Sequence, residues 1–208
     1  MSGHPVIIAT GEKYQAETDF VGGGGYSLDH TRTYRAFGST GNMFGPKWLG
    51  AYDFGRLNIA ACTGYLCMGP LSVAARLPDG STYTYTWEWV NSLPPAVQYT
   101  VVGAAAAGVF RHNEYDPAGG WSLTKDRLTY AYSELGDIQS VSTTGGVTLM
   151  KFVYGNVPNQ PLQVINTAGQ SVNFNWANNR VQSIQDSNGS VWTYGVSDRL
   201  NQATSESA

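Results

Sequence analysis

Residues 162–177 read LQVINTAGQSVNFNWA, and residues 181–194 read VQSIQDSNGSVWTY. Each stretch has an apolar segment, a polar turn that ends in glycine, and a second segment that closes on an aromatic residue. Apolar and polar residues arranged around a glycine-containing turn are typical of a β-hairpin. The two stretches therefore predict two hairpins of one design.

The same pattern begins further upstream, so the chain contains an internal repeat. Ile138, Val141, Gly145, Thr148 and Met150 recur 24 residues later as Leu162, Ile165, Gly169, Val172 and Phe174; the last repeat has Val181 and Ile184 after 19 residues and Gly189, Trp192 and Tyr194 after 20. A lone hairpin cannot bury its apolar face, so we expect the repeats to stack into a continuing sheet. Its aromatic side should carry Phe174, Trp176, Trp192 and Tyr194 in register.

Composition favours the same fold class over the whole chain. Charged residues make up 13% of the 208 residues, about half the usual share, while there are 25 glycines and 13 tyrosines. Glycine favours turns and aromatic residues favour strands. The four alanines at 104–107 lie between glycines and predict a loop insertion. We expect an almost helix-free, all-β, mostly antiparallel fold.

Charge excludes two classes of partner. The net charge of -3 offers no basic face for nucleic acid or for an anionic membrane surface. No apolar run approaches the ~20 residues of a membrane span, and residues 1–10 lack the regions of a signal peptide. We therefore expect no membrane span, and export only through another segment or a secretion machine.

Residues 81–90 contain an aromatic stripe. Tyr83, Tyr85, Trp87 and Trp89 alternate with polar residues, which predicts a strand with one aromatic face. These rings are predicted to pack between neighbouring sheets. The alternative is a sugar- or surface-binding module that uses the stripe as a contact surface; the variants Trp87→Ala and Trp89→Ala on a glycan array would discriminate the two.

A series of short motifs runs in order through the chain. They are GHPV (3–6), TGEKY (10–14), ETDF (17–20), RTY (32–34), FGPKW (44–48), YD (52–53), RL (56–57), LPDG (77–80) and WSL (121–123). The series resembles the domain that precedes the repeats in bacterial Rhs proteins. The hairpins resemble the YD repeats of Rhs proteins, of toxin-enclosing components of insecticidal toxin complexes, and of teneurins.

The resemblance implies two domains, with an Rhs-type β domain at 1–126 and degenerate YD-repeat hairpins at 127–208, the last one incomplete. The Tyr-Asp pair of the repeat stands here as Tyr132-Ser133, Tyr154-Gly155, Trp176-Ala177 and Tyr194-Gly195, so the aspartate is lost each time. The family's self-cleavage motif has no match in this chain. The implied architecture is a segment of a spiral β-shell that encloses a toxin domain, made in the bacterial cytoplasm and exported by a secretion machine.

The predicted function is therefore structural and non-enzymatic, with no catalytic, cofactor-binding or metal-binding residues. His4, His30 and His112 lie far apart in the sequence, and no pattern places any of them near a Ser or Cys nucleophile in the fold. A hydrolase would need two converging carboxylates, from candidates such as Glu12, Glu17, Asp19, Glu88, Asp116 and Asp126. The turn at 186–189 lacks the acidic ladder of a calcium-binding repeat. No single residue is predicted to be indispensable.

The expected partners are the remaining shell, a toxin domain, or another copy of the chain that pairs through an edge strand. Few charges guard the strands after Asp186, and unpaired edges recruit other strands, so a homo-oligomer is predicted. Cys62 and Cys67 enclose four residues that fit a hairpin tip. That spacing allows a disulfide outside the cell and free thiols in the cytosol, and both alternatives stay open.

Overall fold

The computed structural model describes residues 6–7, 11–23, 27–37, 41, 43–60, 72–88, 98–101, 108–112, 120–195 and 204–206; for 6–7, 87–88, 98–101 and 204–206 it describes the backbone alone. Every regular element within these residues is a β-strand, and all strand pairs are antiparallel, which confirms the predicted all-β class. In this part of the chain there is no helix of the length and apolarity that a membrane crossing requires.

The chain divides into two compact units. Unit 1 consists of Met1–Phe54, Leu77–Gly80 and Val153–Ala208, and unit 2 of Gly55–Arg76 and Ser81–Phe152. Both units draw strands from either side of residue 126, where the resemblance implies a domain boundary. That boundary stays a prediction about where the repeats begin.

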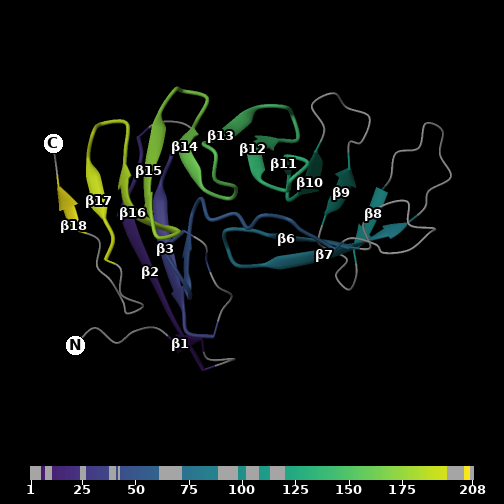
Figure 1. Cartoon of the computed structure of the whole chain (residues 1–208), viewed down its shortest axis with the longest axis horizontal. Coiled ribbons are helices and arrows are strands. Elements are labelled where there is room, and N and C mark those ends of the chain that lie inside the picture. The colour runs from purple at the N-terminus through teal and green to yellow at the C-terminus, as the bar shows by residue number, and fades with distance from the viewer. Residues whose placement is uncertain are drawn as a thin grey trace. The chain divides into compact units, whose positions relative to one another are not determined.

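Unit 1 contains two groups of paired strands (Figure 1). Its four-stranded sheet has the order β1-β2-β3-β4, with β1 (Val6–Ile7), β2 (Glu12–Phe20), β3 (His30–Arg35) and β4 (Trp48–Gly50). Its second ladder runs in chain order through β14 (Pro161–Ile165), β15 (Ser171–Ala177), β16 (Arg180–Gln185), β17 (Val191–Thr193) and β18 (Thr204–Glu206).

The core of unit 1 forms where the four-stranded sheet meets the hairpins of the second ladder. Phe20 of β2 packs on Trp192 of β17, with ring centroids 4.6 Å apart. On the hairpin side, Phe174 and Trp192 both pair with Ile184, and all three are buried. Burial of large side chains such as these contributes roughly 2 kcal/mol each. Phe174 and Trp192 of the predicted aromatic face therefore lie in this core, whereas Trp176 is only half-buried.

Unit 2 is a single ladder of neighbouring strands. They are β5 (Asn58–Ala60), β6 (Ser72–Arg76), β7 (Thr82–Glu88), β8 (Gln98–Val101), β9 (Val109–His112), β10 (Trp121–Lys125), β11 (Leu128–Tyr132), β12 (Ile138–Thr143) and β13 (Thr148–Tyr154), whose last two residues belong to unit 1. Phe110, Leu123, Tyr130 and Val141 stand opposite one another on four adjacent strands and are at most 8% exposed. A continuous apolar row therefore links the hairpins of unit 2.

One turn design recurs between the repeat strands. In each case the glycine N–H donates to the carbonyl oxygen three residues earlier, as in Gly146 to Thr143 (2.9 Å), Gly169 to Asn166 (3.1 Å) and Gly189 to Asp186 (3.2 Å). The three glycines have φ angles of 87°, 78° and 87°. Only glycine adopts this left-handed conformation without strain, which explains why each polar turn ends in it.

The side chain of the first turn residue forms further hydrogen bonds with the backbone of the turn. Asn166 Oδ1 accepts hydrogen bonds from the backbone N–H groups of Ala168 (3.0 Å) and Gln170 (2.9 Å). Asp186 Oδ1 does the same for Asn188 and Ser190, both at 2.9 Å. Short polar side chains that bond their own backbone are the reason Asn and Asp favour such turns. The turn chemistry therefore accounts for Asp186 without a bound calcium ion.

The structure differs from the predicted repeat by one residue at two places, the apolar pair of the middle repeat and the turn glycine of the first. The buried pairs are Ile138 and Val141, Pro161 and Val164, and Val181 and Ile184, and the turn glycine of the first repeat is Gly146. Leu162, predicted to face the core, is 48% exposed, and Gly145 does not have a positive φ.

A β-bulge lies in the strand before the turn in the first and the last repeat. The pairing shifts so that Tyr132 lies opposite Ile138 while Ala131 lies opposite Ser140. A similar shift brings Trp176 opposite Val181 and Asn175 opposite Ser183. An extra residue on one strand lets side chains three positions apart share a face, which strict alternation does not anticipate.

Candidate functional site: a buried ion-pair network in unit 1

The site begins with an irregular pair of strands. Along β2 and β3, Glu17 pairs with Arg32 and Thr18 with Thr31, but Phe20 pairs with His30, so Asp19 is the extra residue of a bulge. A bulge turns one additional side chain toward the face it would otherwise avoid. Asp19 and Phe20 consequently both point into the core, where the Asp19 side chain is 3% exposed.

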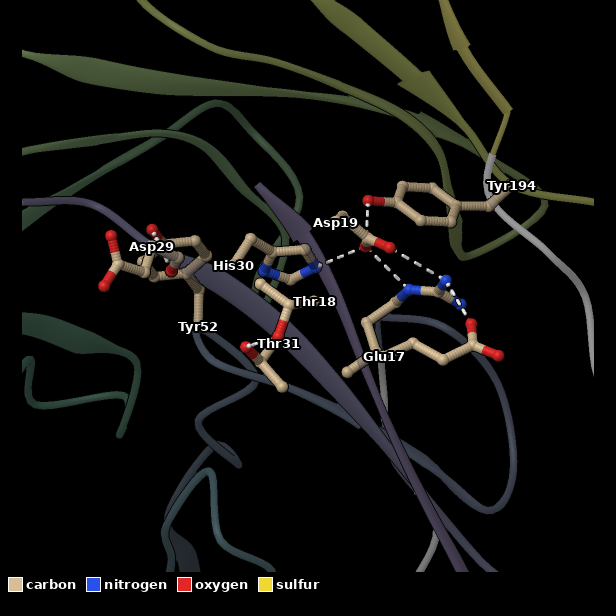
Figure 2. Close-up of polar contacts among 9 residues, drawn as sticks. Glu17, Thr18, Asp19, Asp29, His30, Thr31, Tyr52 and Tyr194 are labelled. Carbon is tan, nitrogen blue, oxygen red and sulfur yellow. Dashed lines mark hydrogen bonds and ion pairs between the residues drawn. The ribbon is translucent and has the colours of Figure 1, made fainter. Parts of the chain in front are cut away.

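The carboxylate of Asp19 is the centre of the network (Figure 2). Its Oδ2 accepts hydrogen bonds from Arg32 Nε and from the Tyr194 hydroxyl, both at 2.8 Å. Its Oδ1 accepts a third from an Arg32 terminal nitrogen at 3.0 Å. Asp19 and Tyr194 are 175 residues apart in the chain, so the carboxylate ties β2 to the segment after β17.

Arg32 is held by charge and by aromatic rings. Its terminal nitrogen also donates to Glu17 at 2.9 Å, and its guanidinium lies 4.7 Å from the Tyr194 ring and 4.9 Å from the Trp48 ring. Burial opposes the charged form, but the hydrogen bond and the charge of Asp19 more than offset it, so the pKa of Arg32 rises above its usual value. Arg32 therefore stays a cation although it is only 2% exposed.

His30 lies next to this ion pair and is fully buried. Its ring stacks on Tyr52 at 5.5 Å and lies 5.2 Å from Phe44, while its Nε2 is 3.6 Å from Asp19. Neither ring nitrogen has a hydrogen-bond partner among the described residues. Burial lowers the pKa of His30 from 6.5 to about 3; Asp19 opposes this shift and Arg32 adds to it. The ring is therefore neutral.

Two tyrosines, Tyr52 and Tyr194, lie against the ring of His30. Burial, together with the nearby charge of Asp19, raises the pKa of Tyr194 well above its usual value. Burial likewise raises the pKa of Tyr52, whose hydroxyl donates to the Asp29 carbonyl at 2.8 Å. Both hydroxyls therefore keep their protons and act as donors, so Tyr194 serves as a cross-sheet hydrogen bond and not as a base.

The arrangement is suited to cohesion. Asp19 accepts three hydrogen bonds, which occupy three of the roughly four lone-pair positions of a carboxylate, and its side chain is buried. Buried charges in proteins are retained where they are paired and hydrogen-bonded, as these are. The network fastens the four-stranded sheet to the hairpins of unit 1 by directional contacts.

The structure brings together some of the residues that the sequence singled out. Of the candidate carboxylates, Glu17 and Asp19 meet on one guanidinium, while Glu12 pairs with Arg35 at 2.8 Å. Each of these carboxylates is therefore paired with an arginine. Asp126 is exposed, and Asp116 and the Glu88 side chain lie outside the described residues.

The aromatic stripe lies partly outside the described residues. The alternation holds over residues 82–86, where Tyr85 is fully buried and stacks on Phe110 at 4.7 Å. Tyr83 is half-buried, and Lys125 Nζ lies 5.3 Å from its ring. Tyr85 is therefore part of the core of unit 2 and not of an exposed surface. The Trp87 side chain and Trp89 are not described, so the contact-surface alternative stays untested for them.

The remaining candidates contribute little to a site. His112 stacks on Trp121 at 3.9 Å and contacts the Glu134 carboxylate at 3.1 Å, as a strand histidine satisfied by its neighbours. A backbone hydrogen bond from Gly120, and to a lesser degree His112, lowers the pKa of Glu134. His4, Cys62 and Cys67 lie outside the described residues. Within the described part of the chain, no three His, Cys, Asp or Glu residues group as metal ligands.

Sequence reasoning missed the network as a unit. In the sequence, Asp19 stands out as a carboxylate within the motif ETDF, Arg32 as part of the motif RTY, and Tyr194 as a packing aromatic. An available signal was the charge of Glu17, Asp19 and Arg32 within two short motifs, ETDF and RTY, of a chain poor in charge. No pattern in the sequence could have connected Asp19 with Tyr194, because the contact forms only when the sheets pack.

Comparison with known proteins gives a match for the first part of the chain. Residues 3–85 match a family model described as a domain of unknown function, DUF6531. No characterised protein matches the chain in a sequence search. The matched region is less than half of the chain, and it includes Asp19, His30 and Arg32 but not Tyr194.

Proposed function

We propose that the chain is a non-enzymatic structural module, a segment of an Rhs-type shell of YD-like hairpins that encloses a toxin domain. The observation that carries the proposal is the regular construction of the hairpins. The same glycine turn and the same inward apolar pair recur in three repeats, and the same bulge precedes the turn in the first and the last of them. Such units stack by burying each other's apolar faces, which is how an extended wall is built.

The buried network supports a structural role as well. Its ionisable side chains are hydrogen-bonded to one another or held neutral, and they link strands that are far apart in the chain. A wall that must exclude a toxin from its surroundings benefits from directional contacts that fix how its sheets pack. The ordered motifs between residues 3 and 123, which resemble the corresponding domain of Rhs proteins, support the family assignment within this proposal.

The proposed partners are the rest of the shell, an enclosed toxin domain, and another copy of the chain joined through an edge strand. Production in the bacterial cytoplasm and export by a secretion machine belong to the same proposal. The neutral, hydroxyl- and amide-rich outer face of β15 and β16, with Asn173, Asn175, Ser183 and Gln185, suits a surface that lies next to a polypeptide without binding it tightly.

Electron microscopy and protease protection test this function on the protein purified with the polypeptide that accompanies it. We expect a hollow particle and a companion domain that resists added protease. The variant Val164→Ala truncates a fully buried side chain and should weaken the protection of the companion domain against protease. The variant Leu162→Ala changes a residue that is 48% exposed and serves as the matched control. Solid particles, or a companion domain cleaved at once in the unmodified protein, would contradict the proposal.

A further inference from the structure

We propose that His30 is an acid-sensitive latch in unit 1: its neutral ring is packed in the contact between the four-stranded sheet and the hairpins, and uptake of a proton makes that packing unstable. The proposal concerns a residue for which the structural role above supplies no use. No hydrogen bond requires an imidazole at this position, because both ring nitrogens of His30 lack hydrogen-bond partners in the described structure.

The surroundings of the ring come from four segments. Phe20 and Asp19 belong to β2, Tyr52 follows β4, and Phe44 precedes it; Tyr194 follows β17, with its ring centroid 6.4 Å from that of His30. Figure 2 shows the ring of His30 beside Asp19, with the Tyr194 hydroxyl directed at the same carboxylate. The latch therefore touches both sides of the contact.

The stability of a protonated His30 depends on the charged groups that face its ring. They are Asp19 of β2 and Arg32 of β3, with Glu17 bound to the far side of Arg32. Tyr52 and Tyr194 face it as neutral hydroxyls. Among the residues that the structure describes, Asp19 is the one anion that forms an ion pair with the ring, but its negative charge is already shared with Arg32. A second cation in this enclosed space would compete with Arg32 for the same carboxylate.

The sign of the pH effect follows from these positions. In the unfolded chain the imidazole of His30 has an ordinary pKa near 6.5, whereas burial lowers it to about 3 in the folded chain. Between these two values the unfolded state binds the additional proton, so stability is lost as the pH falls from about 6.5 toward 3. At about pH 5 this group alone should lower the folded-to-unfolded ratio about thirtyfold relative to neutral pH.

Urea denaturation of the whole chain at about pH 7.5 and about pH 5 tests the latch. The variant His30→Gln keeps a polar side chain that cannot take up a proton, and His112→Gln removes a histidine whose side chain is 16% exposed as the matched control. We expect the folded-to-unfolded ratio of the unmodified chain and of His112→Gln to fall about thirtyfold more than that of His30→Gln. Equal falls in all three proteins would overturn the proposal.

A second measurement keeps the test decisive if His30→Gln does not fold. Heteronuclear NMR of the histidine rings in the unmodified chain should show His30 neutral down to about pH 4 for as long as unit 1 is folded. A ring that takes up a proton near neutral pH without loss of the β2, β3 and β17 signals would overturn the latch.

The latch itself is tested on this chain without any toxin, so it can fail or hold independently of the proposed function. The biological role of the latch rests on the proposed function. In an acidic compartment, loosening of the contact between the four-stranded sheet and the hairpins would favour opening of the shell. The acid dependence of protease protection, compared between the unmodified shell and His30→Gln, addresses that use. We expect the unmodified shell to lose protection at a higher pH than the variant, and equal dependence would argue against it.

Discussion

At the scale of single residues, unit 1 depends on how one buried carboxylate is shared. Asp19 receives two hydrogen bonds from Arg32 and one from Tyr194. Removing one partner of a buried ion pair leaves the other charge uncompensated, and this costs far more than the pair gains over an apolar replacement. We therefore expect substitution of a buried partner to lower the free energy of unfolding far more than substitution of an exposed partner.

The variant Asp19→Asn should destabilise the protein by about 3–5 kcal/mol, because it leaves the Arg32 guanidinium buried with Glu17 as its remaining counter-charge. Glu17→Gln is the matched control. Its side chain is 20% exposed, so the loss should be about 1 kcal/mol. Urea denaturation at neutral pH measures both. Losses of equal size would mean that Asp19 is not the centre of the network.

At the scale of elements, the hairpin turns decide the register of the repeat. Gly146 has a positive φ of 87° and an added Cβ would meet no atom within 4 Å, whereas its neighbour Gly145 has no positive φ. The two glycines are adjacent and differ in backbone conformation, so a Cβ at either position reports on conformation and not on packing.

The variant Gly146→Ala should lower the free energy of unfolding by about 1–2 kcal/mol, since an L-residue is strained in the left-handed region. Gly145→Ala should change it by no more than about 0.5 kcal/mol or raise it slightly. Thermal or urea denaturation compares the two variants. The opposite order would restore the register in which Gly145 closes the turn.

At the scale of the whole molecule, cohesion of the ladders comes from antiparallel pairing of neighbouring strands and from the apolar rows that cross them. The row of Phe110, Leu123, Tyr130 and Val141 in unit 2 and the row of Phe174, Ile184 and Trp192 in unit 1 follow the same rule. An antiparallel sheet can extend by pairing further strands at its edges, so we expect the strand edges to be the place where the molecule associates.

We expect the purified chain to self-associate through an edge strand at tens of micromolar protein. Exposed N–H and C=O groups of an edge pair with another strand unless charges or proline oppose it. Static light scattering combined with size-exclusion chromatography measures the mass. A strict monomer over the whole concentration range would contradict the expected homo-oligomer, and a mass that rises with concentration would agree with it.

The sequence by itself determined the fold class, the hairpin design and the position of the polar turns. These features depend on neighbours in the chain: alternation over a few residues, glycine where φ must be positive, and Asn or Asp where a side chain bonds its own backbone. Asn166 with Gly169 and Asp186 with Gly189 were therefore readable as turns, and Phe174 and Trp192 as core residues.

Only the tertiary structure decided the register before the turn and the composition of the network. The bulges at Asp19, before Ser140 and before Ser183 shift one side chain to the other face, and adjacent apolar residues such as Val164 and Ile165 do not reveal which one is buried. The contact of Asp19 with Tyr194 spans 175 residues. Local propensity carries no information over that distance, because such a contact is selected by the packing of two sheets and not by either strand.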